Sequence, residues 1–319
     1  MKAASHAISR RQWIIGAAAA AGASLPLSQH FLHAADAANE TPPPPTSKPV
    51  DHRYQIAASD WMMLKRQTPG ALTRAKECEL DGVEVDMGPL GKRPDFENKL
   101  REEKFRDDYL AQAKSLGLQI SSFAMSAFYG QSITEHPQAE QFCNDWIELM
   151  PQLGTKVGFL PIIFRKEDEP DVAVGKVVAL MKKVAPRGEK AGVIIGLNTS
   201  LDAAANKKML DDIASPAVRI AYNCGEAIDA NRDVYAELKL LGRDRIAQVI
   251  PTLSDGVWLE NDKRIDVPKL KQVLDDIGWR GWLVLQRSRE QAKARDVKYN
   301  FGGNARYLKS IFQQQQRPA

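Results

Sequence analysis

From residue 54 onward, short apolar runs alternate with longer stretches in which apolar residues recur at helical spacing. The apolar runs lack polar alternation, which is typical of strands buried on both faces of a parallel sheet. The run at residues 282–285 shows this most clearly, because it follows a glycine turn and ends abruptly at Gln286. The pattern predicts eight strands, at residues 54–58, 81–86, 118–125, 156–163, 193–197, 218–222, 246–250 and 282–285.

Helical patterns follow the strands. They cover residues 71–80, 96–116, 137–153, 171–184, 201–213, 231–241, 266–277 and 291–314, the last broken at Gly302-Gly303. Eight strand–helix pairs over about 260 residues predict an α/β fold, a single-domain (β/α)8 TIM barrel. The alternative is an open doubly wound sheet. It lacks support, since no G-x-G-x-x-G motif follows the first strand.

The first 50 residues do not share this alternation. Arg10-Arg11 precedes an apolar, Ala-rich run, and an A-x-A arrangement lies at residues 35–37. Together these features indicate a twin-arginine export signal and hence a periplasmic or other extracytoplasmic location. The run is too short to span a bilayer, so we expect no membrane span in the mature chain, although an uncleaved tail or anchor is the alternative. The predicted parts are a signal at 1–37, a Pro-rich linker at 38–50, the barrel at 51–313 and a disordered tail at 314–319.

Charge and cysteine content narrow the classes of partner. The formal net charge of +4 falls to +2 for residues 38–319, because the predicted signal holds three basic residues and one acidic residue. This near-neutral balance does not predict nucleic acid as a partner. The three cysteines, Cys78, Cys143 and Cys224, are widely spaced and form no C-x-x-C pair. We therefore predict that they are small core residues and neither disulfides nor zinc ligands.

Polar residues end most of the predicted strands. In a (β/α)8 barrel the functional face lies at the carboxyl ends of the strands, so candidate site residues are Glu84, Asp86, Ser126, Arg165, Asn198, Asn223, Thr252 and Gln286. Glu84 and Asp86 form a candidate acid–base pair, and the alternative is that one is hydrogen-bonded inside the barrel while the other is solvated. Trp61, just after the first strand, is a candidate to stack on a ligand, or else simply packs in its loop.

Charged residues next to the strand ends extend the candidate list. Arg165 and Lys166 follow the fourth strand and Arg287 follows the eighth, where they are candidates to bind a phosphate or carboxylate. The alternative is that they are solvated loop charges. Glu226 lies one helical turn beyond Asn223, where it either supplies a carboxylate to the site or is a helix-start acid stabilised by the helix dipole.

The chain resembles the xylose-isomerase-like barrel superfamily, and more closely its sugar phosphate isomerase/epimerase branch. The resemblance covers residues 51–312 and rests on the order of three motifs: Ala71-x-x-Arg-Ala-Lys with Leu80-Asp-Gly-Val-Glu-Val, Gly192-Val-Ile-Ile-Gly-Leu, and Ile277-Gly-Trp-x-Gly-Trp-Leu-Val-Leu. It implies a divalent metal held by a Glu, an Asp, a His and a Glu at the ends of strands five to eight. Those four positions here hold Asn198, Asn223, Thr252 and Gln286.

These replacements remove the charge that would hold an ion. Hard divalent cations bind anionic oxygen, and transition metals bind imidazole or thiolate. His52 and His136, the histidines outside the predicted signal, do not fall at ligand positions. We therefore predict a mouth of uncharged hydrogen-bonding groups, with no metal and no other cofactor. Such groups suit a hydroxyl-rich ligand.

Three functions remain open. In the first, the barrel is a pseudoenzyme or binding module for a carbohydrate or polyol. In the second, it is a working metal-independent isomerase, epimerase or lyase, with Glu84 or Asp86 as base and Arg165 or Arg287 stabilising an oxyanion. The third, a zinc-dependent apurinic-site endonuclease, ranks last because the chain lacks the His and Glu ligands and the basic groove that it would need. The oligomeric state is not predicted.

Overall fold

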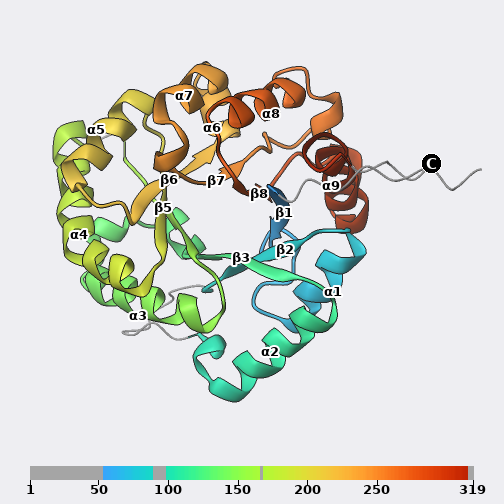
Figure 1. The fold of residues 1–319 in the computed structure, drawn as a ribbon, viewed down its shortest axis with the longest axis horizontal. Helices are drawn as coiled ribbons and strands as arrows, with labels where there is room; N and C mark the ends of the chain where they lie inside the picture. The colour runs from blue at the N-terminus through green and yellow to red at the C-terminus, as the bar shows by residue number, and fades with distance from the viewer. Residues whose placement is uncertain (1–52, 89–97, 166–167, 315–319) are drawn as a thin grey trace, which may run out of the picture. The chain divides into compact units, whose positions relative to one another are not determined.

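A computed structural model describes residues 53–88, 98–165 and 168–314. Eight parallel strands close into a barrel in chain order, with β1 paired to β8 (Figure 1). The strands are β1 (Tyr54–Ser59), β2 (Gly82–Asp86), β3 (Gln119–Ala124), β4 (Val157–Pro161), β5 (Ile194–Asn198), β6 (Val218–Asn223), β7 (Ile246–Ile250) and β8 (Gly281–Leu285). The predicted TIM barrel is confirmed. The predicted signal and linker, and all of the predicted tail except Gln314, lie outside the described residues.

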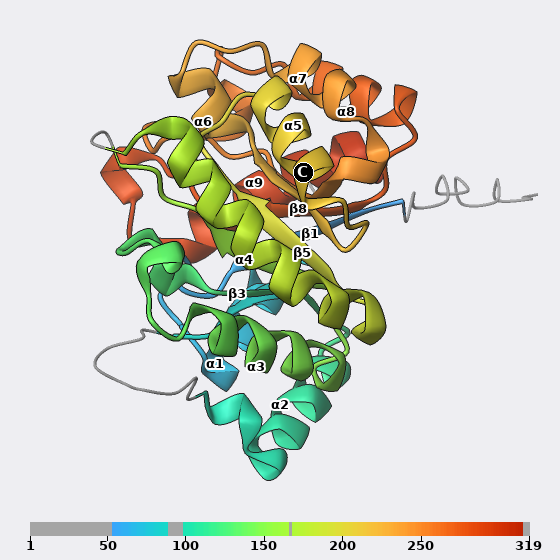
Figure 2. The same ribbon diagram turned by 90° about the vertical axis from the view of Figure 1, so that its left-hand side faces the viewer.

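A ring of helices surrounds the barrel and covers its outer face (Figures 1 and 2). The helices are α1 (Pro69–Glu77), α2 (Glu103–Ser115), α3 (Ala139–Gln152), α4 (Pro170–Ala191), α5 (Ala203–Ile213), α6 (Cys224–Asp229), α7 (Val234–Leu241), α8 (Val267–Asp276) and α9 (Val297–Phe312). Cys78, Cys143 and Cys224 are buried and free, as predicted.

Three helices differ from the sequence prediction. Helix α4 continues through Pro186 and ends at Ala191, and Gly192, with a φ of 67°, provides the left-handed C-cap. Helix α9 continues through Gly302-Gly303, because the Trp258 ring packs where a Cβ on Gly303 would lie, 2.8 Å away. Helix α6 is absent from the predicted helices, although the alternative for Glu226, an acid at a helix start, agrees with it; the Asn223 side chain starts this helix by accepting hydrogen bonds from the backbone N–H groups of Gly225 and Glu226.

The barrel interior holds an apolar cluster and a polar group on the same strands. The apolar cluster consists of Ala57, Ala124, Phe159, Ala221, Ile250 and Val284, with Trp61 and Trp282 packed against it. The polar group gathers around Glu84, which is fully buried. Small residues on three strands leave room for the Phe159 ring, so side chains fill the interior.

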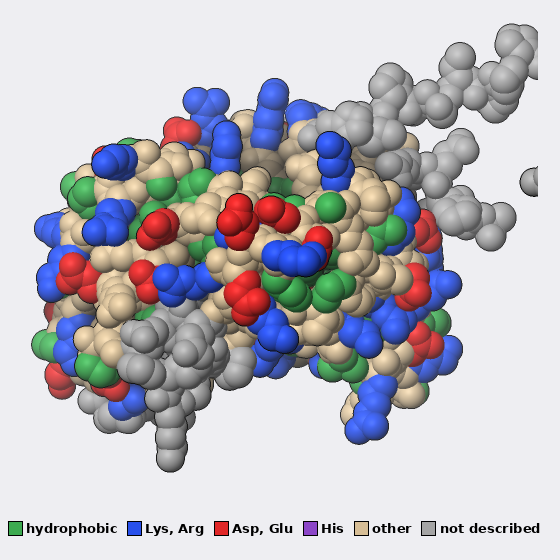
Figure 3. All heavy atoms as spheres, turned by 90° about the horizontal axis from the view of Figure 1, so that it is seen from below, with side chains coloured by type: hydrophobic (Ala, Val, Ile, Leu, Met, Phe, Trp, Pro, Cys, Tyr) green, Lys and Arg blue, Asp and Glu red, His purple; other side chains and the backbone are tan. Residues whose placement is uncertain are grey.

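The outer surface mixes charges of both signs. On the face shown in Figure 3, the described Lys and Arg side chains are interspersed with Asp and Glu side chains. Within the described ranges, no helix combines the length and apolarity needed to cross a membrane. That nucleic acid is not a partner stays a prediction.

Candidate functional site

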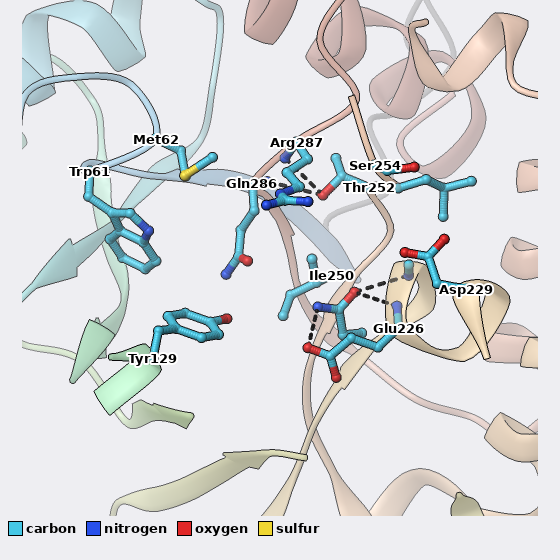
Figure 4. Close-up of a pocket in the computed structure, with 13 residues that line it drawn as sticks. Trp61, Met62, Tyr129, Glu226, Asp229, Ile250, Thr252, Ser254, Gln286 and Arg287 are labelled. Atoms are coloured by element: carbon cyan, nitrogen blue, oxygen red, sulfur yellow. Dashed lines mark hydrogen bonds between the residues drawn. The ribbon is translucent and has the colours of Figure 1, made fainter. Parts of the chain in front are cut away.

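A cavity of about 400 Å³ opens at the carboxyl ends of the strands. Its lining comes from the loops after β1, β3, β7 and β8 and from α6. The size suits a small-molecule ligand. The lining residues are Trp61, Met62, Tyr129, Asn223, Gly225, Glu226, Asp229, Ile250, Thr252, Leu253, Ser254, Gln286 and Arg287 (Figure 4).

Two amides hold a carboxylate at the β5 and β6 side of the cavity. Asn198 Nδ2 donates to Glu226 Oε2 at 3.3 Å, and Asn223 Nδ2 donates to Glu226 Oε1 at 3.2 Å. Asn198 itself is buried and is not a lining residue. Burial raises the pKa of Glu226 to about 7. The two positions where the resemblance implies metal ligands therefore orient a carboxylate that titrates near neutral pH.

Thr252 and Gln286 complete the mouth at β7 and β8. Thr252 Oγ1 accepts hydrogen bonds from the backbone N–H groups of Gln286, at 3.1 Å, and Arg287, at 3.2 Å. The Gln286 side chain donates to Glu84 Oε1 at 3.3 Å. Both residues line the cavity, as predicted for the strand ends, but part of their hydrogen-bonding capacity is used within the protein.

Glu84 lies below the cavity and is not among its lining residues. Its Oε1 accepts from Ser59 Oγ at 2.7 Å as well as from Gln286, and its Oε2 accepts from Ser122 Oγ and Gln248 Nε2, both at 2.7 Å. Burial raises the pKa of Glu84, and the four donors oppose that shift. The carboxylate connects β2 to β1, β3, β7 and β8, so its geometry favours a structural role over that of a base.

Asp86 does not pair with Glu84. One of its oxygens lies 2.7 Å from Arg66 Nε, and the other accepts from the backbone N–H of Ser126 at 3.3 Å. The backbone N–H of Asp86 donates to buried Asp60 at 3.3 Å. Burial raises the pKa of Asp86, and burial followed by the charge of Asp86 raises that of Asp60. The charged neighbours of Asp86 are thus Arg66 and Asp60, and neither is predicted from the sequence.

Arg165 is not brought to the cavity. Its guanidinium forms an ion pair with Glu135 at 2.9 Å, and it is absent from the cavity lining. Lys166 lies outside the described residues. Of the basic residues considered from the sequence, Arg287 is the one that lines the cavity.

Two aromatic side chains form one side of the cavity (Figure 4). Trp61 and Tyr129 each lie against Phe159, with ring centroids 6.5 and 6.1 Å away. Tyr129 is 40 % exposed, yet its hydroxyl end points inward and lies 3.2 Å from Asn198 Oδ1. Burial of that hydroxyl, followed by the charge of Glu226, raises the pKa of Tyr129. Sequence reasoning missed Tyr129, although an aromatic residue just beyond β3 is a usable signal.

The mouth is less neutral than predicted. Helix α6 places Glu226 and Asp229 on the cavity wall, opposite the aromatic side. The family's metal still does not fit this donor set, since the four strand-end positions hold amides and a hydroxyl. Across the described parts of the chain, no three His, Cys, Asp or Glu side chains gather closely enough to hold an ion. A divalent cation needs more anionic or imidazole donors than this arrangement offers.

A match to a family model identifies the family of the chain. The family model described as "Xylose isomerase-like TIM barrel" matches residues 72–311.

The chain belongs to the xylose isomerase-like TIM barrel family.

Solved structures of similar fold agree with this membership. A sugar phosphate isomerase/epimerase from Parabacteroides distasonis has a TM-score of 0.64 at 16% identity, covering 84% of this chain and 98% of that one. An L-ribulose 3-epimerase gives 0.64 at 15% identity, covering 81% and 94%. A D-allulose 3-epimerase from Methylomonas sp., solved with D-allulose, gives 0.63 at 12% identity, covering 83% and 99%. A comparison with curated proteins found no match.

The raised pKa of Glu226 predicts a pH-dependent stability. A carboxyl group whose folded-state pKa exceeds its unfolded value stabilises the fold at low pH, and this stabilisation is lost as pH rises through the folded pKa. Between pH 5 and pH 8, the free energy of unfolding of the wild type should fall by about 2 kcal/mol relative to that of Glu226→Gln. Urea unfolding of both proteins at both pH values measures this difference. The pKa shifts of Glu84, Asp60 and Asp86 are common to the two proteins and cancel in the comparison. Parallel pH profiles for the two proteins would contradict the assignment.

Proposed function

We propose that this family member binds a carbohydrate or polyol in the cavity, without the family's divalent metal, as a pseudoenzyme or binding module. The observation that carries the proposal is the state of the four strand-end positions. They hold neutral side chains, and each is already hydrogen-bonded within the protein, to Glu226, to Glu84 or to backbone N–H groups.

The cavity offers complementary contacts for a hydroxyl-rich ligand. Gln286 and Thr252 supply neutral donors and acceptors, and the Glu226 carboxylate is an acceptor for hydroxyl groups. Trp61 presents a flat apolar surface suited to the C–H face of a sugar. Sugars present this combination of one apolar face and many hydroxyls, which supports the proposal. The further proposal that residues 1–37 direct export would place the ligand outside the cytoplasm.

Elemental analysis coupled to a binding screen tests the proposal. Protein purified from its native compartment without chelators should contain far less than one divalent ion per chain. Calorimetry should detect at least one sugar or polyol, and Trp61→Ala should weaken that binding about tenfold. A stoichiometric divalent ion would refute the loss of the metal. If no member of a broad sugar and polyol panel binds, the binding function is wrong.

Glu226 favours a second candidate, a metal-independent isomerase or epimerase. The carboxylate lies in the cavity, titrates near pH 7 and is linked through Asn198 to the Tyr129 hydroxyl. It would take a proton from the carbon next to a carbonyl, the electron pair would move onto the carbonyl oxygen, and Tyr129 would donate a hydrogen bond to that oxygen. Return of the proton to the former carbonyl carbon, with the hydroxyl proton of the first carbon passing to the former carbonyl oxygen, would complete an isomerisation. An epimerisation would need a second acid on the opposite face of the carbon that loses the proton.

Turnover assays on the same panel of ketoses and aldoses separate the two candidates. Conversion that is lost in Glu226→Gln while ligand binding persists favours the enzyme. Binding without conversion favours the pseudoenzyme or binding module. Glu84→Gln is the less informative variant, since Glu84 accepts four hydrogen bonds inside the barrel and does not line the cavity.

A further inference from the structure

Charged groups are distributed unevenly around the cavity. Arg287 is the only Lys or Arg among the described residues that line it. Its guanidinium makes no ion pair with any described residue. The neighbouring arginines are paired: Arg289 lies 2.6 Å from Asp255, and Arg264 lies 2.7 Å from Asp262. The backbone of Arg287 is held by Thr252, so the start of this side chain is fixed at the mouth.

The negative charges of the cavity wall lie away from Arg287. Glu226 and Asp229 come from α6, whereas Arg287 follows β8, and Figure 4 shows them on different sides of the cavity. Glu226 is held by two amides and needs no cation to complete its hydrogen bonds. Asp229 lies 3.7 Å from Arg264. The guanidinium of Arg287 therefore remains available to a ligand.

Coulombic balance limits the anion that fits. Repulsion from Glu226 and Asp229 grows in proportion to the charge of the ligand, and nothing except Arg287 in the described lining is cationic, so a phosphate dianion is disfavoured more strongly than a monoanion. A carboxylate carries a single charge and matches the planar guanidinium through two parallel hydrogen bonds. Its hydroxylated chain would extend toward Glu226 and Asn223, which accept and donate hydrogen bonds there.

We infer that the cavity selects a sugar acid, a polyhydroxylated chain with one carboxylate, and that Arg287 is the residue that determines this specificity. The inference rests on the proposed function, since it needs a hydroxyl-binding cavity. It narrows the ligand class from any carbohydrate or polyol to aldonic or uronic acids.

Calorimetry with matched pairs of alditol and aldonate tests the inference. Suitable probes are D-glucitol with D-gluconate, xylitol with D-xylonate, and erythritol with D-erythronate, with D-glucose 6-phosphate as the dianion. At least one aldonate should bind about tenfold or more tightly than its alditol, and added salt should reduce that ratio. Arg287→Gln should abolish the preference. The matched control Arg280→Gln removes the same charge just before β8, at the other end of the barrel, and should keep it.

The outcomes separate this inference from the function on which it rests. Equal binding of an alditol and its aldonate leaves the proposed function intact and overturns the sugar-acid class. Tighter binding of glucose 6-phosphate than of every aldonate also overturns it. An aldonate preference that survives Arg287→Gln shows that another group selects the acid and rejects the role of Arg287. Failure of every alditol, aldonate and neutral sugar to bind rejects both proposals.

Discussion

Replacing Glu84 with alanine should lower the free energy of unfolding by about 3–5 kcal/mol. The substitution leaves four donors, on Ser59, Ser122, Gln248 and Gln286, without their acceptor inside the barrel. A buried donor that loses its partner costs its full desolvation penalty, and these donors come from four different strand positions around the barrel. Urea or thermal unfolding at pH 8, followed by circular dichroism, measures the loss.

Glu226→Ala is the matched control for this variant. It also removes a carboxylate near the strand ends, but the two amides that it leaves lie beside an open cavity that admits water. At pH 8 no loss of unfolding free energy above about 1 kcal/mol is expected, because removing the ionised Glu226 also relieves the burial that raises its pKa. If both variants lose equally little unfolding free energy, Glu84 does not stabilise the barrel. Glu84 would then again be a candidate catalytic residue.

Restoring the family's ligand types should create the metal site that, on our proposal, the wild type lacks. The variant combines four substitutions, Asn198→Glu, Asn223→Asp, Thr252→His and Gln286→Glu. Without metal it should unfold more easily than the wild type, because the new carboxylates lie beside Glu226 and Glu84. With Mn²⁺ at about a thousandfold above its dissociation constant, it should gain about 4 kcal/mol. Thermal unfolding with and without Mn²⁺ measures this gain.

Two proteins serve as controls for the restored site. The wild type should show no stabilisation by Mn²⁺. Gln286→Glu alone adds one carboxylate beside Glu84 but not the other three ligands, so Mn²⁺ should not raise its thermal stability. If Mn²⁺ stabilises the wild type as strongly as the fourfold variant, the native residues already bind a cation and the proposed loss of the metal is wrong.

Local sequence patterns predicted the eight strands but did not predict every helix correctly. Each apolar run became a strand because a parallel strand buried on both faces needs apolar residues in sequence. Gly302-Gly303 did not break α9, since Trp258, distant in sequence, packs on it. Helix α6 lacks an apolar repeat of its own because it has only six residues, and its start depends on the Asn223 side chain.

The candidate site was predictable to a similar extent. Asn223, Thr252, Gln286, Trp61 and Arg287 all line the cavity, because closing a parallel barrel brings its strand ends to one rim. Arg165 pairs with Glu135 instead, a partner in another loop that the sequence does not reveal. Tyr129 reaches the cavity from a short helix beyond β3, so the positions of the strand ends alone do not predict it.

The order of apolar runs and glycine turns by itself determined the barrel and the amides at its rim, since both depend on local spacing along the chain. Only the tertiary structure decided which carboxylate is enclosed and which is accessible. Glu84 is enclosed because its four donors converge from β1, β3, β7 and the end of β8, up to 202 positions away in the sequence. Glu226 is accessible because α6 turns it toward the cavity, where Asn198 and Asn223 hold it.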